Sequence, residues 1–113
     1  MATTQEALAE GVQPGNTGIN ILYTTPSNSL GTRITACTVY NPTTTACTYP
    51  LFLFPAGITT GAQYSVITTA ALAGKETAAI PELINQLIPT SGSLAIQVNT
   101  ATTAAIWAAG LQF

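Results

Sequence analysis

Residues 32–55 read TRITACTVYNPTTTACTYPLFLFP, and they contain two runs of β-branched, aromatic and aliphatic residues on either side of NPTTT. β-branched and aromatic residues favour strands, whereas an Asn-Pro pair followed by short polar residues favours a turn. The stretch therefore predicts two strands, at residues 33–40 and 47–54, that pair around a turn centred on Pro42.

Alternation within the two runs predicts which side chains share a face, because successive side chains of a strand point to opposite sides. The set expected to face inward in the first run is Thr35, Cys37 and Val39. The set expected to share one face in the second run is Tyr49, Leu51 and Leu53. Pro50 interrupts the second run, and because proline cannot donate to a ladder it predicts an edge position or a bulge.

The same strand signals recur along the rest of the chain, between turn residues. Further strands are expected at residues 19–26, 62–72, 75–83, 93–100 and 102–113, with a short irregular crossing at residues 84–92. The strands at 62–72 and 75–83 are separated by Ala73 and Gly74, and Gly74 is expected at positive φ. Seven to eight short strands bounded by turns predict an all-β protein, a single antiparallel β-sandwich of jelly-roll or Ig-like type.

The N-terminal region lacks these strand signals. Residues 3–10, TTQEALAE, predict one or two turns of helix with Gly11 as terminator. Two interpretations stay open, a frayed end and an arm that becomes ordered on a neighbouring subunit. We therefore expect an N-terminal arm at residues 1–18 and a β-sandwich domain at residues 19–113, with no signal peptide visible at the start.

The chain is unusually poor in charge: ionised residues make up 5% of its 113 residues, against about 25% in typical domains. The six are Glu6, Glu10, Arg33, Lys75, Glu76 and Glu82. A surface of Thr, Ser, Asn, Gln and Ala costs little to desolvate, so it suits burial against other subunits and predicts a homo-oligomer, a dimer or trimer. A net charge of −2 with two isolated basic residues argues against nucleic-acid partners, and no apolar window is long enough for a membrane span.

Groups that carry out chemistry are scarce. Histidine is absent, so acid–base catalysis would depend on glutamates, and a glycosidase-like pair of Glu10 with Glu76 stays open as an alternative. Lys75 lies in the turn AGKET, where a lysine is normally solvated. Cys37 and Cys47 have two interpretations, buried reduced thiols or a cross-strand disulfide, and two thiolates do not complete a metal site. The sequence thus predicts no catalytic, cofactor or metal residues, and no enzyme.

Several segments together resemble the small virion proteins of tailed bacteriophages. The resemblance is carried by LYTTP (22–26), GTRITACTVYNPT (31–43), LFLFP (51–55), AGKET (73–77) and AAIWAAGLQF (104–113). It covers roughly residues 19–113 and consists of strands and turns, so no functional residue is transferred. The resemblance implies a compact β-sandwich attached to a virus particle, of the capsid decoration (cement) or head–tail accessory type. The low charge and the two cysteines depart from that pattern.

The expected function is therefore a non-enzymatic virion structural protein, a capsid decoration or cement protein that binds and stabilises the outer capsid surface. Its expected partners are the major capsid protein or other virion proteins, and its expected location is the outer surface of the virion, after synthesis in the host cytoplasm. One alternative is a tail, collar or fibre-base subunit. Another is a carbohydrate-binding module or adhesin domain, which predicts exposed coplanar aromatics drawn from Tyr23, Tyr64 and Trp107.

Overall fold

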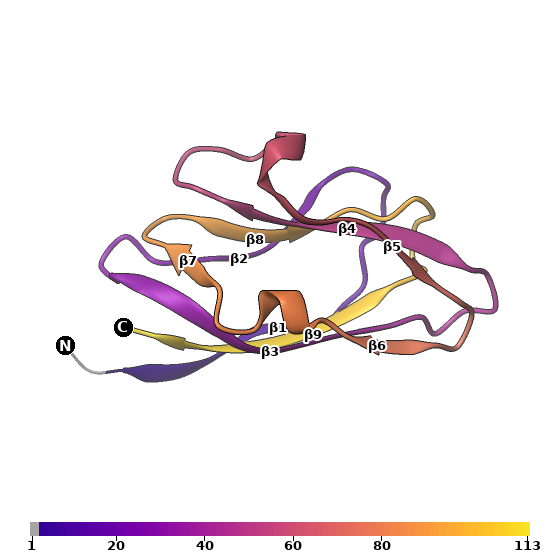
Figure 1. Cartoon of the computed structure of the whole chain (residues 1–113), viewed down its shortest axis with the longest axis horizontal. Helices are drawn as coiled ribbons and strands as arrows, with labels where there is room; N and C mark the ends of the chain where they lie inside the picture. Colours follow the sequence, from indigo (N-terminus) through magenta and orange to yellow (C-terminus); the bar gives the residue numbers. More distant parts are fainter. Residues whose placement is uncertain (1–2) are drawn as a thin grey trace.

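Two antiparallel sheets packed face to face form the molecule (Figure 1). The computed structural model describes residues 3–113, with residues 67–70 described through their backbone alone. The first sheet contains β1 (Thr4–Val12), β3 (Gly31–Tyr40), β6 (Thr77–Ala79), β7 (Leu87–Pro89) and β9 (Ala105–Gln112). The second sheet contains β2 (Asn20–Thr24), β4 (Cys47–Phe54), β5 (Ser65–Leu72) and β8 (Ser93–Ile96). Two short 3-10 turns complete the described elements, η1 (Ala62–Tyr64) and η2 (Pro81–Leu83).

The order of the strands identifies the topology. The first sheet runs β1-β9-β3-β6, with β7 also pairing β3, and the second runs β2-β8-β4-β5. The chain passes from one sheet to the other at most of its connections, and β4–β5 and β6–β7 are the steps that stay within a sheet. This order is that of a jelly roll, two Greek keys wound around one core. The predicted all-β antiparallel sandwich is confirmed, in the jelly-roll form.

The space between the sheets is filled mainly by aliphatic side chains, together with Tyr49 and the two cysteines. Its fully buried members include Ile34, Val39, Tyr49, Leu51, Leu94, Ile96 and Ile106. Leu53 packs against this core, so the predicted shared face of the second run is confirmed. The irregularity predicted at Pro50 is present as a shift in the pairing of β4 with β5, where the two steps from Tyr49 to Leu51 face three steps of β5. The extra residue is therefore on β5, and β4 lies inside its sheet, so Pro50 is not at an edge.

In β3 the predicted inward set is correct for Cys37 and Val39 and wrong for Thr35, which is exposed. The pairing of β3 with β9 shifts between Ile34 and Ala36, so β3 contains one extra residue at this point. Such a bulge reverses the alternation on one side of it, and Ile34 therefore faces the core with no exposed surface.

The predicted hairpin of residues 33–40 with 47–54 is wrong, because β3 and β4 belong to different sheets. Residues 41–46 carry the chain from one sheet to the other. Asn41 is buried and holds this crossing: its side-chain amide donates to the Thr45 carbonyl at 2.7 Å and its oxygen accepts from the Thr43 N–H at 3.0 Å. Polar residues that looked like a hairpin turn thus form a connection between layers.

The strands predicted on either side of Ala73 and Gly74 do not pair with each other, since β5 and β6 lie in different sheets. Lys75, and not Gly74, has the positive φ at 63°. Gly74 is required for space, because a Cβ there would lie 2.6 Å from the Thr44 carbonyl oxygen. The predicted strand at 75–83 is reduced to β6 followed by η2, and the crossing at 84–92 includes strand β7.

The helix predicted for residues 3–10 is wrong: Thr4–Val12 form β1, which pairs antiparallel with β9. A helix of two turns is marginal in isolation, whereas a strand here pairs with β9 and buries Leu8 and Ala9 in the core. Thr4 lies opposite Gln112, so the first and last described strands end side by side (Figure 1). That residues 1–18 also reach a neighbouring subunit stays a prediction.

Candidate interaction surfaces

Two of the charged residues considered for catalysis, Lys75 and Glu76, hold the turn before β6. Glu76 accepts a hydrogen bond from the Ala73 N–H at 2.7 Å, and the Lys75 amine donates to the Pro42 carbonyl. Glu10 lies exposed on β1, opposite Trp107. Within residues 3–113, no group of three or more Cys, Asp or Glu side chains could hold a metal ion. The absence of enzymatic activity stays a prediction.

The two cysteines are free and buried. Burial raises the pKa of the Cys37 thiol to about 12, which keeps it protonated at neutral pH. The Cys47 thiol lies 3.8 Å from the Thr103 carbonyl, to which it donates weakly, and 3.9 Å from the Asn41 amide. Both thiols are buried in the core cluster, so both side chains act here as small core residues.

Of the three aromatics proposed for stacking on sugars, Trp107 is the one on open surface, with 54% of it exposed. The Tyr23 hydroxyl lies 3.1 Å from the Thr32 hydroxyl, and the Tyr23 side chain packs against the core. The Tyr64 ring packs edge-on against Phe54, with 5.8 Å between ring centroids. Tyr23, Tyr64 and Trp107 therefore do not form an exposed coplanar platform.

Charge is distributed unevenly between the two sheets. Glu6 and Glu10 lie on β1, Arg33 lies on β3, and the other ionised side chains lie in the connections on either side of β6. The second sheet and its connections at residues 13–19, 55–64 and 97–104 contain no Asp, Glu, Lys, Arg or His. We call this part of the molecule the neutral half. When a partner covers this surface, no ionised side chain has to be removed from water, so the free-energy cost of desolvation is low.

The outer face of the second sheet is partly covered by the chain itself. Phe52 and Phe54 point outward from β4 and stack with 5.3 Å between ring centroids. Ile19 and Tyr64 pack against them, forming a second, smaller cluster. Figure 1 shows the η1 segment above this sheet. The connection at residues 55–64 therefore forms the outer surface of the neutral half, where Ile58 is 36% exposed.

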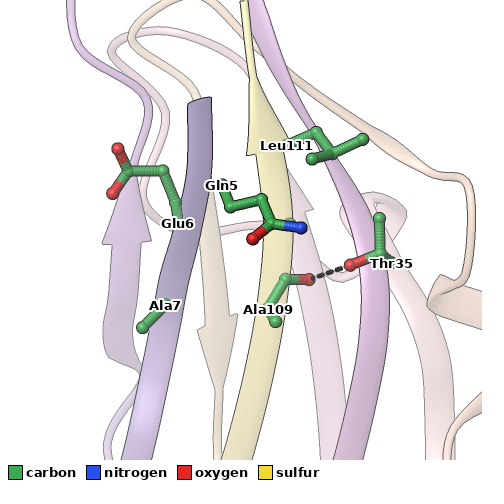
Figure 2. Close-up of a pocket in the computed structure, with 7 residues that line it drawn as sticks. Gln5, Glu6, Ala7, Thr35, Ala109 and Leu111 are labelled. Carbon is green, nitrogen blue, oxygen red and sulfur yellow. Dashed lines mark hydrogen bonds between the residues drawn. The ribbon is translucent and has the colours of Figure 1, made fainter. Parts of the chain in front are cut away.

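The outer face of the first sheet is open and hollowed. Two adjoining depressions, of about 470 and 270 Å³, lie over β1, β9 and β3 and share Ala7 and Ala109. We call the combined depression the alanine trough, with a floor of Ala7, Ala36 and Ala109 and a rim of Gln5, Thr35, Trp107 and Leu111. Figure 2 shows the Thr35 hydroxyl, which donates to the Ala109 carbonyl at 3.2 Å.

Small residues on three neighbouring strands produce this hollow. The alanine side chains at its floor are short, so they leave space between the larger side chains on either side. The Trp107 indole, on the rim of the trough, lies close to Gly11 of β1, which adopts φ 68°. A Cβ at Gly11 would lie 2.7 Å from the indole ring, so glycine permits this arrangement. Sequence reasoning missed the trough, since residues 3–10 were predicted as helix and the alanines of β1 were therefore not aligned with those of β9 and β3.

No family model matches the sequence, and no curated protein matches it significantly. Several solved structures share its fold, among them three with TM-scores above 0.5. A chain of the infectious bursal disease virus particle has a TM-score of 0.58 at 13% identity, with 99% of this chain and 31% of that chain covered. A chain of the Gx strain of the same virus has a TM-score of 0.54 at 14% identity, with 98% and 32% covered.

The third structure is that of Bacillus endospore appendages, which are disulfide-linked pili. It has a TM-score of 0.52 at 15% identity, and the match covers 98% of this chain and 87% of that chain. The present chain thus spans about a third of the length of the viral chains and most of the pilus chain. The fold is therefore shared with a chain of a virus particle and with a chain of a disulfide-linked pilus. No helix within residues 3–113 is long and apolar enough to cross a membrane.

Proposed function

We propose that this chain is a non-enzymatic structural protein of a virus particle, which binds the outer surface of the capsid and stabilises it as a decoration protein. The observation that carries the proposal is the neutral half, in which four strands and three connections contain no ionised side chain. Covering such a surface costs no ion desolvation, so repeated contact with the major capsid protein is favourable. The fold shared with a virus-particle chain supports this role.

The neutral half is the part of the molecule that contacts the particle in this proposal. Its exposed tip at residues 55–61 contains Ile58, which offers an apolar side chain on an uncharged connection. Ile84 is a matched residue elsewhere, because it is 37% exposed and follows η2 close to Glu82. The two isoleucines differ mainly in the charge of their surroundings.

The test compares Ile58→Lys with Ile84→Lys in binding to particles that lack the protein. We expect Ile58→Lys to weaken binding at least about tenfold, since an unpaired lysine would be buried at the contact. Ile84→Lys is expected to bind like the wild type. Equal binding by the two variants would contradict the assignment of the neutral half to the particle contact.

The same properties suit a tail, collar or fibre-base subunit, which is the alternative to decoration. Labelling purified virions with gold-conjugated antibody against the chain separates the two roles by position. Label spread over the head supports decoration, and label confined to one vertex or to the tail supports the alternative. Absence of the chain from purified virions would refute both.

A further inference from the structure

The free edges of both sheets are poorly suited to pairing with another strand. The register of β1 shifts twice along β9, that of β2 shifts once along β8, and that of β5 shifts twice along β4. The remaining edge is divided between β6 and β7, each of three residues. Bulged or very short edges do not accept a long partner strand. Association of this protein should therefore use an open face.

The two outer faces differ in this respect. That of the second sheet carries its own aromatic cluster with Tyr64 and Ile19 against it, whereas that of the first sheet leaves the alanine trough open and Trp107 half exposed. We propose that the alanine trough is a self-association surface, on which two copies of the chain pack their β1-β9-β3 faces together about a two-fold axis. The inference rests on the proposed function only in placing the dimer on a virus particle. Self-association itself is a property of the isolated protein.

The charges of this face identify a second copy as the occupant. Glu10 lies opposite Trp107 on β9, and Arg33 lies opposite Leu111 on β9 but on the other side of that strand. The two exposed charges are thus at diagonal corners, about 14 Å apart along the strands and about 10 Å apart across them. This pair of one acid and one base at opposite corners is complementary to itself, whereas Glu6 lies at the β1 side of the trough with its carboxylate directed away from the floor (Figure 2).

A two-fold axis in the plane of the face, midway between those corners, places Glu10 of each copy opposite Arg33 of the other. The strands of the two copies then cross steeply, as in the orthogonal class of sheet packing. The same rotation brings Trp107 of each copy toward the exposed bulge at Thr35 and Ala36 of the other. Each copy thus places its Trp107 ring against small side chains of the other copy. Stable interfaces favour this arrangement, in which a large aromatic side chain fills a hollow on the partner.

The first experiment measures self-association by sedimentation equilibrium of the isolated wild-type protein, Ala109→Lys and Ala71→Lys. Ala109 lies on the trough floor, and Ala71 is an exposed strand alanine of β5 in the other sheet. We expect the wild type and Ala71→Lys to dimerise, and Ala109→Lys to dimerise at least about tenfold more weakly. Circular dichroism checks that both variants keep their sheet content.

A wild-type protein that stays monomeric up to about 0.5 mM would overturn the proposal, and so would equal dimerisation by the two variants. These measurements use no particle. The dimer proposal can therefore be refuted while the Ile58→Lys test supports the proposed function, and the proposed function can be refuted while the dimer is observed.

The second experiment tests the charge pairing with Glu10→Arg, Arg33→Glu and the double variant. Each single variant places like charges opposite each other twice in the dimer, so its dimerisation should weaken at least about threefold at low salt. The double variant restores opposite charges and should recover dimerisation close to that of the wild type. Failure of the double variant to recover would refute the two-fold arrangement.

Discussion

Single side chains at the centre of the sandwich make stability dependent on pH. Burial raises the pKa of Cys37 to about 12 from an ordinary value of 9.0, and burial, with smaller contributions from Cys37 and Cys47, raises that of Tyr49 to about 12. Both groups are neutral in the folded protein at a pH where they ionise in the unfolded chain. The contribution of these two neutral groups to the free energy of unfolding is complete below pH 9 and is lost as the pH rises toward 12.

We therefore expect the free energy of unfolding to fall above pH 9, by up to about 1.4 kcal/mol per pH unit for each such group. Urea unfolding at a series of pH values between 8 and 11 measures this dependence. Cys37→Ala should show a shallower fall than the wild type, whatever its absolute stability. Parallel curves for the two proteins would show that this thiol does not titrate as its burial requires.

At the scale of the element, β1 is the strand whose role differs most from expectation. Leu8 is 3% exposed and packs in the core, whereas Leu30, in the connection before β3, is 69% exposed. Leu8→Ala should lower the free energy of unfolding by about 2–4 kcal/mol, and Leu30→Ala by less than about 0.5 kcal/mol. Chemical unfolding of both variants measures the difference. Two equal, small effects would show that residues 1–18 are an arm and no part of the sandwich.

The strands that alternation predicted well are those with large side chains. Tyr49 and Leu51 face the core as expected, because burial of these large side chains is favourable and the extra residue of the register shift lies on β5, so β4 keeps its alternation. Strand pairing could not be predicted in the same way. The Asn41 turn and the Gly74 turn have hairpin composition, but whether two strands share a sheet is decided by non-local partners such as β9 and β8.

The trough was beyond sequence reasoning for a related reason. Alanine is a strong helix former and is depleted in strands, so Ala7, Ala36 and Ala109 give no strand signal in the sequence. Its significance arises when three strands place these small residues side by side on one face. Leu8 was the available signal in β1, since one leucine among polar residues fits a strand with one buried position as well as a short helix.

For the whole molecule, the small number of ionised groups predicts how binding responds to salt. The proposed particle contact uses the neutral half, so neither ion pairs nor counterion release contribute to it. Its dissociation constant should change less than about threefold between 0.05 and 0.5 M NaCl. Co-sedimentation with particles over that range measures the effect. A steep loss of binding with salt would require charges that this surface does not contain.

The adjacency of Thr4 and Gln112 in the first sheet also bears on how the chain can be rewired. A short linker between the two ends would close the polypeptide into a ring without disturbing any strand. New ends could then be opened at residues 55–61, giving a circular permutant with the same jelly roll and a different order of synthesis. Because those new ends would emerge from the neutral half, a bulky fusion partner attached there would block that surface, and the same partner attached beside Thr4 or Gln112 would leave it accessible.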